Sequence, residues 1–304
     1  MSAGTAPMRH AMTIDVEDYF QVQAFAGQVA RADWDDFALR VAESTGRILD
    51  AFARAGVQGT FFTLGWVAER CPATIRAIVA GGHELASHGY DHTRADAQDP
   101  GTFRADVRRT KRILEDLGGV EVRGYRAATF SIGPRNPWAF SVLEEEGYRY
   151  SSSTYPVRHD LYGNPAGARA PFRPSGTRIC EVPMTTLRLA GHNLPCSGGG
   201  YFRLLPYPVY RRLFAAATRA NARPGIFYLH PWEVDPDQPR IPGAGLRTRL
   251  RHNVNLRRTA TRLDALLADF AWDRMDRVFA NDIAAAQPGP ASSGHTPLPE
   301  ARAA

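Results

Sequence analysis

The chain of 304 residues is 44% hydrophobic, 10% aromatic and 22% charged, proportions that are ordinary for a folded globular protein and exclude one that is mostly disordered. Its 37 lysines and arginines against 31 aspartates and glutamates give a formal net charge of +6, a modest excess that favours an anionic partner. The arginines between residues 240 and 262 are not interleaved with aromatic side chains, which argues against a nucleic-acid-binding protein.

Short apolar runs alternate along the chain with stretches of helical period, the pattern of βα units around a parallel sheet or barrel. The expected strands are 11–16, 59–64, 83–87, 122–126, 148–152, 179–183 and 225–229. The expected helices are 41–55, 73–80, 102–117, 137–146, 208–221 and 253–270. The sequence therefore predicts an α/β fold built as a distorted, incomplete (β/α) barrel.

The chain divides into three expected parts. Residues 1–10 are predicted to be a flexible N-terminus, 11–283 one domain, and 284–304, rich in alanine, proline, glycine and serine, a disordered tail. Within the domain, 156–176 and 196–201 are rich in glycine or proline and are predicted to be surface loops. Long loops in a compact domain are often binding loops.

Three carboxylates, Asp15, Glu17 and Asp18, stand within four residues at the end of the first expected strand. The carboxyl ends of strands are where α/β barrels carry their chemistry. In extended backbone Asp15 and Glu17 share a face, so they need a cation or a shared proton to offset their repulsion. A solvated turn is the alternative explanation for this segment.

Two histidines, His88 and His92, follow the third expected strand four residues apart, beside a glycine that permits a tight bend. On a helical turn, or a loop curled like one, both imidazoles can reach a single ion. Two imidazoles with one carboxylate leave coordination positions open for water and substrate, which is typical of a catalytic metal site. A third histidine, His230, directly follows the last expected strand.

These motifs resemble the polysaccharide deacetylases of carbohydrate esterase family four, which share the domain of the rhizobial chitooligosaccharide deacetylase. The resemblance runs from about residue 12 to residue 233. More narrowly, 15–20, 60–70, 82–84 and 198–203 are similar to deacetylases of bacterial exopolysaccharide loci linked to exosortase sorting systems. Residues from about 198 to 279 resemble the extra C-terminal region of that subgroup.

The resemblance implies a role for each candidate residue. Asp15 is the expected general base, and Arg126 the arginine that positions it, although the proline of the family's Arg-x-Pro motif is missing. His88 and His92 are expected to bind a divalent metal ion, and Zn²⁺ is the ion we expect. His230 is the expected general acid.

Two further positions depart from the family pattern. Val16 stands where the family has its metal-binding aspartate, so Glu17 is the preferred carboxylate ligand and Asp18 the alternative. Ser151 stands where the fourth motif has an aspartate, which leaves open the partner that orients the acid histidine. Asp235 is a candidate substitute.

The implied reaction is metal-dependent removal of acetyl groups from N-acetylated sugar units of a bacterial exopolysaccharide or its precursor, with release of acetate. Such an enzyme is a hydrolase acting on carbon–nitrogen bonds other than peptide bonds. One alternative is an amidohydrolase acting on a small cyclic amide or ureide. The other is a catalytically silent glycan-binding module, which the altered third and fourth motifs favour.

The surroundings of the protein are also an expectation. Three cysteines, Cys71, Cys180 and Cys196, cannot all pair within one chain, which favours a reducing compartment. Neither an export signal nor an apolar run of about 18 residues is visible, so we expect a cytoplasmic protein. The expected partner is an acetylated polysaccharide or oligosaccharide and not a nucleic acid. Contact with membrane-associated synthesis machinery is conceivable but not evident in the sequence.

Overall fold

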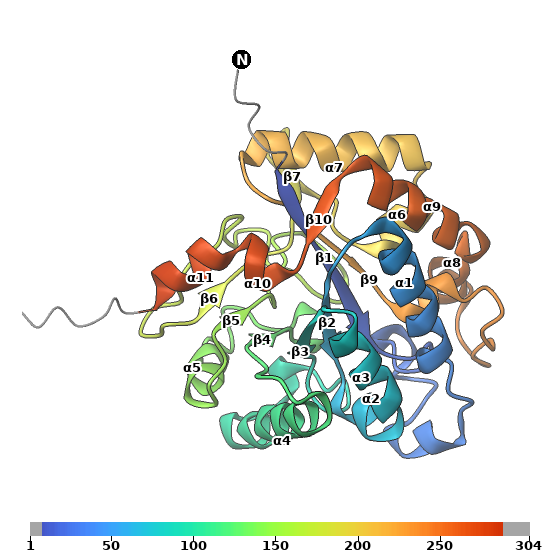
Figure 1. The fold of residues 1–304 in the computed structure, drawn as a ribbon, viewed down its shortest axis with the longest axis horizontal. Coiled ribbons are helices and arrows are strands. Elements are labelled where there is room, and N and C mark those ends of the chain that lie inside the picture. The colour runs from blue at the N-terminus through green and yellow to red at the C-terminus, as the bar shows by residue number, and fades with distance from the viewer. Residues whose placement is uncertain (1–7, 288–304) are drawn as a thin grey trace, which may run out of the picture.

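A curled sheet of parallel strands forms the centre of the computed structural model, which describes residues 8–287 (Figure 1). The sheet has eight strands in the order β10-β1-β2-β3-β4-β5-β6, and β9 also pairs with β1. Their bounds are β1 (Arg9–Val16), β2 (Thr60–Thr63), β3 (Glu84–Ser87), β4 (Gly124–Tyr125), β5 (Tyr150–Ser151), β6 (Cys180–Glu181), β9 (Ile226–Leu229) and β10 (Ala271–Asp273). The result is an open half-barrel, which confirms the predicted α/β fold class.

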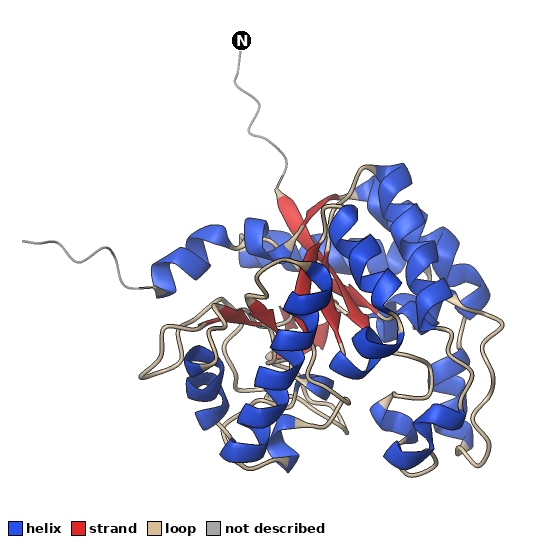
Figure 2. Ribbon diagram, turned by 60° about the horizontal axis from the view of Figure 1, so that its bottom comes forward, coloured by secondary structure: helices blue, strands red, loops and turns tan. Residues whose placement is uncertain are grey.

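Helices surround the strands, as Figure 2 shows. The α-helices are α1 (Val41–Ala55), α2 (Gly65–Arg70), α3 (Pro72–Ala80), α4 (Pro100–Gly118), α5 (Trp138–Glu145), α6 (Gly199–Leu204), α7 (Tyr207–Asn221), α8 (Leu246–Asn253), α9 (Leu256–Asp269), α10 (Met275–Val278) and α11 (Ala280–Ala286). The 3₁₀ helices are η1 (Gln23–Phe25), η2 (Arg31–Asp36), η3 (Ala95–Ala97), η4 (Ala128–Phe130) and η5 (Pro231–Val234). Within the described residues, no helix is both long enough and apolar enough to span a membrane.

Local sequence explains where the longest helix begins and ends. The Asp99 side chain accepts hydrogen bonds from the backbone N–H groups of Gly101 and Thr102 at 2.8 and 3.1 Å, which caps α4. Pro100 occupies its first position, where a missing N–H costs nothing. Gly119 ends the helix with φ 65°, a left-handed conformation that glycine adopts without strain.

Alternation along β1 assigns its side chains to two faces. Met12, Ile14 and Val16 are fully buried in the hydrophobic cluster that includes residues of α1, whereas Ala11 belongs to a second cluster on the other face. Asp15 follows the alternation of Ala11, because successive strand residues point to opposite faces. The candidate base therefore points away from the face that packs against α1.

Most predicted elements are confirmed, but several were missed. The sequence reading did not include β10, the antiparallel hairpin of β7 (Thr186–Leu189) and β8 (His192–Pro195), or helices α2, α6 and α8. The prediction of a loop over 196–201 was wrong at its end, since α6 begins at Gly199. Gly198 precedes it in extended conformation, so the glycines here begin a helix.

The predicted ends of the domain need correction. β1 begins at Arg9, inside the segment 1–10 that was predicted to be flexible, because Arg9 and His10 pair with Ala271 and Trp272 of β10. At the other end α11 continues to Ala286, inside the segment 284–304 that was predicted to be a disordered tail. The remaining parts of these two segments, 1–7 and 288–304, lie outside the described residues.

Candidate active site

The candidate residues lie at one edge of the sheet. Asp15 is in β1 and Glu17 directly follows this strand, while His88 directly follows β3. Arg126 directly follows β4, and His230 directly follows β9. These strands are parallel, so their carboxyl ends meet at the same edge, where α/β folds place their active sites.

Glu17, His88 and His92 form a cluster of metal-binding side chains. Each offers one ligand atom, and the three atoms lie within 4.8 Å of one another. His88 Nδ1 lies 2.8 Å from the backbone carbonyl oxygen of Arg126, which fixes the ring and leaves Nε2 for an ion. Burial lowers the pKa of His88 to about 4, so the ring is neutral at pH 7, as a metal ligand must be. Carboxylate and imidazole are ligands that suit Zn²⁺.

The loop after β3 brings the two histidines together without a helical turn. Gly89 has φ 77° and His92 has φ 59°, so both residues adopt the left-handed conformation. For His92 this costs about 1 to 2 kcal/mol. The backbone N–H of Tyr90 donates to Asp106 Oδ1 at 2.6 Å, which holds the bend. The two ring centroids come to lie 5.4 Å apart.

The carboxylate of Glu17 fits a cation. Glu17 is only 1% exposed, and its Oε2 atom takes part in no hydrogen bond, although His92 Nε2 lies 2.9 Å away. A buried carboxylate oxygen without a donor is costly unless a positive charge compensates it. Burial raises the pKa of Glu17, but the neighbouring His92 and His230 outweigh it and lower the pKa to about 2. The carboxylate is therefore ionised, as a metal ligand must be.

Asp18, the alternative ligand, is engaged elsewhere. Its Oδ2 accepts hydrogen bonds from the backbone N–H groups of Arg40 and Val41 at 2.8 and 2.9 Å. Its Oδ1 accepts one from the N–H of Tyr19 at 2.9 Å. Asp18 thus holds the start of α1 against the loop after β1, and it is Glu17 that the structure places beside His88 and His92.

Asp15 is held by Arg126 in the interior. Nη1 of Arg126 donates to Asp15 Oδ1 at 2.6 Å and to Thr13 Oγ1 at 2.9 Å. Its Nε donates to the backbone carbonyl of Ser152 at 3.2 Å, and the Arg126 side chain is fully buried. These contacts fix the orientation of the Arg126 guanidinium, and the guanidinium in turn fixes the orientation of the Asp15 carboxylate.

His230 lies between two carboxylates. Its Nδ1 is 2.8 Å from Glu233 Oε1, and its Nε2 is 3.5 Å from Glu17 Oε1. Burial lowers the pKa of His230, but the charges of Glu17 and Glu233 outweigh burial and raise it to about 9. With Nδ1 facing Glu233, the ring presents Nε2 toward Glu17. The His230 side chain is 20% exposed, so a ligand can reach it.

Sequence reasoning missed Glu233, and its suggestion of Asp235 was wrong. Asp235 accepts hydrogen bonds from Arg40 at 2.7 and 2.9 Å and lies 3.3 Å from Arg47. Its carboxylate is therefore paired with arginines in and next to α1 and not with His230. The hydroxyl of Ser151, where the resemblance expects an aspartate, lies 2.7 Å from that of Ser153. A His-x-x-Glu spacing was the available signal, because residues three apart meet across a helical turn.

Two cavities adjoin this edge of the sheet. One of about 330 Å³ is lined by His92, Phe20, Trp34 and Arg94 among others. The other cavity has a volume of about 270 Å³. Arg94 lines it as well, together with several aromatic and polar side chains that include Tyr155. Arg94 thus lies between two hollows beside the metal-binding cluster.

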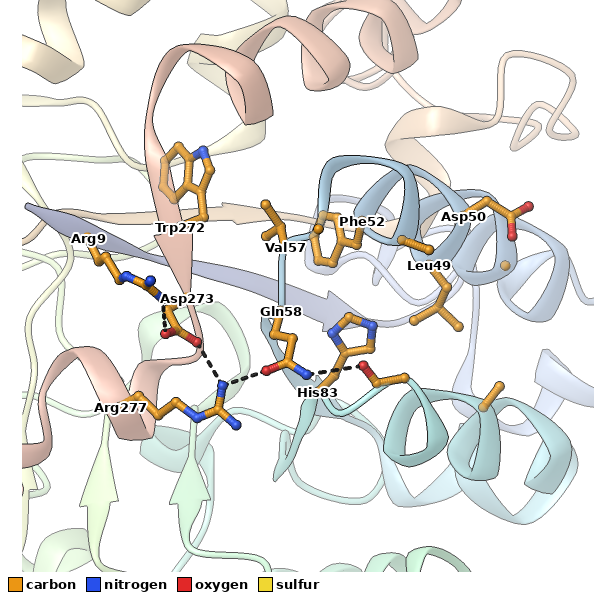
Figure 3. A pocket seen from close by; sticks show the side chains of 15 residues that line it. Arg9, Leu49, Asp50, Phe52, Val57, Gln58, His83, Trp272, Asp273 and Arg277 are labelled. Atoms are coloured by element: carbon orange, nitrogen blue, oxygen red, sulfur yellow. Dashed lines mark hydrogen bonds and ion pairs between the residues drawn. The ribbon is translucent and has the colours of Figure 1, made fainter. Parts of the chain in front are cut away.

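A cavity of about 630 Å³ lies at the opposite end of the strands (Figure 3). Gln58 and His83, which line it, precede β2 and β3, and none of the candidate residues is among its lining. Among its charged groups, Asp273 accepts hydrogen bonds from Arg9 at 2.9 Å and from Arg277 at 3.2 Å.

Comparison with protein families divides the chain in two. Residues 27–151 match the family model described as polysaccharide deacetylase. Residues 152–280 match a model described as a domain of unknown function, DUF3473, which begins well before the C-terminal region of 198–279 that the sequence suggested.

Individual relatives point the same way. The peptidoglycan-N-acetylglucosamine deacetylase of Bacillus cereus is 34% identical over 77 residues, which cover 25% of this chain and 28% of that protein. The chitooligosaccharide deacetylase of Sinorhizobium fredii is 34% identical over 100 residues, which cover 33% of this chain and 44% of that protein. The chain thus spans less than half of the length of these curated relatives.

A solved structure shares the fold. The crystal structure of a putative polysaccharide deacetylase from Mycobacterium smegmatis superimposes with a TM-score of 0.59 at 18% sequence identity, covering 93% of each chain. At this identity the likeness concerns the fold. Residues 27–151 are thus similar in sequence to polysaccharide deacetylases, and the fold is similar to that of this solved structure.

Proposed function

We propose that this protein is a metal-dependent deacetylase that hydrolyses the acetamido groups of N-acetylated sugar units in a polysaccharide and releases acetate. The observation that carries the proposal is the geometry at the edge of the sheet. A buried carboxylate held by an arginine, a cluster of one carboxylate and two imidazoles, and a histidine between two carboxylates lie side by side there. Metal-dependent hydrolysis of an amide can use each of these parts.

Glu17, His88 and His92 would hold the metal ion, and Zn²⁺ is the ion that suits this ligand set best. A divalent ion at this position supplies Lewis acidity, which activates a water molecule and polarises an amide carbonyl. Asp15 takes the proton of the attacking water, and Arg126 holds its carboxylate in place for that step. His230 gives the proton of Nε2 to the departing amine, so that the products are acetate and an amino sugar.

The substrate we propose is an extended glycan, as in a bacterial exopolysaccharide or its precursor. Two cavities meet at Arg94 beside His92, which gives room for sugar units on both sides of the reacting one. The polar and aromatic side chains that line these cavities suit sugar hydroxyls and ring faces. A small cyclic amide would not need both hollows.

The test is acetate release from N-acetylglucosamine oligosaccharides by metal-stripped protein, with and without added Zn²⁺. We expect release that depends on Zn²⁺ and is lost in the Asp15→Asn and His88→Ala variants. Parallel assays on a small cyclic ureide and a glycan-binding measurement separate the alternatives. Hydrolysis of the ureide alone would support an amidohydrolase, and glycan binding without any release would support a silent binding module.

A further inference from the structure

We propose that the region of residues 152–280, which matches a model of unknown function, completes the active site, with Glu233 and Arg203 as positioning residues for His230. This inference rests on the proposed function of His230 as the acid. Ser151 stands where the family has an aspartate. We infer that Glu233, from another part of the chain, takes over the role of that aspartate.

The contacts of the imidazole support this role. Among the described residues, the carboxylates within 4.0 Å of the His230 ring nitrogens are those of Glu17 and Glu233. Oε1 of Glu233 lies 2.8 Å from Nδ1 and also accepts the backbone N–H of His230 at 3.1 Å. With Nδ1–H donating to this oxygen, Nε2 is the nitrogen that faces the metal-binding cluster.

Glu233 is in turn fixed by Arg203 of α6. Nε of Arg203 donates to Glu233 Oε2 at 2.5 Å, and its Nη1 donates to the backbone carbonyls of His252 and Val254 at 2.7 and 3.0 Å. Glu233 is 1% exposed and Arg203 3% exposed. A buried ion pair with this many fixed donors has one geometry, so it can hold an imidazole in one orientation.

At Gly199 the backbone of α6, the helix that carries Arg203, lies directly against the carboxylate of Glu233. A Cβ atom at position 199 would lie 2.1 Å from Glu233 Oε1 and 2.2 Å from its Oε2. The carboxylate therefore occupies the space of a side chain, and only glycine permits α6 to approach it. At the adjacent Gly200 a Cβ atom would meet nothing within 4 Å. The backbone of α6 is thus fitted to the carboxylate at one position.

The first experiment compares Gly199→Ala with Gly200→Ala, two identical changes on neighbouring residues of α6. We expect Gly199→Ala to displace Glu233 and lower kcat by about 10²-fold or more while KM and zinc content stay unchanged. Gly200→Ala is expected to keep the wild-type kcat. Equal kcat in the two variants would overturn the inference.

The second experiment uses a double variant that removes both Glu233 and Arg203, so that no buried charge is left without its partner. Glu233→Leu combined with Arg203→Met replaces the ion pair by apolar side chains, which a folded protein tolerates. We expect the double variant to fold and bind zinc but to lose about 10²- to 10⁴-fold in kcat. Asp235→Asn is the matched control, because Asp235 is equally buried and arginine-paired but does not contact His230. If both variants lose kcat to the same extent, the effect is general destabilisation and the inference fails.

Nuclear magnetic resonance gives a readout that does not depend on activity. In protein labelled with nitrogen-15 at histidine, two-bond correlations report which ring nitrogen of His230 carries hydrogen, and His230→Gln assigns the signal. We expect Nδ1–H in the wild type and its loss in the double variant. Should the wild type release no acetate from any glycan, the proposed function fails, while this signal still decides whether Glu233 and Arg203 orient the ring. An unchanged signal in the double variant would overturn the inference.

Discussion

Asp15 and Arg126 form an ion pair, 2.6 Å between Oδ1 and Nη1, in which both side chains are buried. The arginine also donates to Thr13 and Ser152, so its orientation is fixed before any substrate binds. A base that is held in advance need not reorganise during the reaction. The pair therefore holds the Asp15 carboxylate in one orientation, as the base proposed above requires.

Asp15→Asn should lower kcat for acetate release by about 10²- to 10⁴-fold, because the amide cannot accept the proton of water. Zinc content should stay at the wild-type value, since Asp15 is not part of the Glu17, His88 and His92 cluster. Asp35→Asn, which removes an exposed ion pair with Arg70, is the control and should keep full activity. A kcat above a tenth of the wild-type value would exclude Asp15 as the base.

Glu17→Gln and Asp18→Ala should separate the two neighbouring carboxylates. Glu17→Gln should lower zinc affinity with little loss of stability in the metal-free protein. Asp18→Ala should keep zinc but lose about 1 to 3 kcal/mol of stability, because three backbone N–H groups lose their acceptor. Metal analysis and urea unfolding measure the two effects. Zinc lost from Asp18→Ala and kept by Glu17→Gln would reverse our assignment.

Added Zn²⁺ should raise the melting temperature of the metal-stripped protein. An ion that binds only the folded state stabilises it by about 2.7 kcal/mol at a free concentration of 100 times Kd. Calorimetry with and without Zn²⁺ measures the shift, and a chelator should reverse it. In Glu17→Gln the shift should vanish at the same ion concentration. A shift of equal size in this variant would mean that the ion binds elsewhere.

His10 should make the protein sensitive to acid. Burial lowers its pKa from 6.5 to about 4, and its Nδ1 accepts a hydrogen bond from the backbone N–H of Gly225 at 3.1 Å. The folded state favours the neutral ring. The stability that this ring contributes is therefore present above pH 6.5 and is lost as the pH falls toward 4.

His10→Gln keeps an acceptor at this position but removes the titration. Between pH 7.5 and pH 5, the wild type should lose about 2 kcal/mol more in free energy of unfolding than the variant. Urea unfolding at the two pH values provides the measurement. Parallel losses in the two proteins would show that His10 is not responsible.

Arg94→Ala should affect long substrates more than short ones. The side chain lines both cavities and donates to the backbone carbonyl of Leu161 at 2.8 Å, which ties the loop after β5 to the loop after β3. We expect KM to rise more for an N-acetylglucosamine tetramer than for a dimer, with kcat nearly unchanged. The comparison is made by steady-state kinetics on the two oligomers. An equal effect on both lengths would argue against sugar sites on both sides of the residue.

The candidate residues were found from the sequence because each follows an apolar strand of a parallel sheet. Topology alone then brings Asp15, Glu17, His88 and His230 to one edge, whatever the helices between them do. Glu233 was missed for the opposite reason. Its contact with His230 depends on the short η5 turn, and its orientation depends on Arg203, thirty positions earlier in the chain.

The missed secondary structure has similar physical causes. β10 is three residues long and contains Asp273, so it lacks the apolar run that marks the other strands. α6 begins in glycines, which intrinsically disfavour helix, and it forms because Gly199 packs against Glu233. In both elements, contacts with distant residues override the local preference of the sequence.

The pairing of β1 with β9 and β10 has a consequence for how the protein is made. The strand that carries Asp15 is synthesised before two of its partners, Ile226–Leu229 and Ala271–Asp273, which flank it on opposite sides at Ala11. Until then β1 presents an unpaired apolar edge, which is prone to join other chains. The strand that carries Asp15 therefore waits for these later segments, and nascent chains that stop before them would depend on chaperones to remain unaggregated.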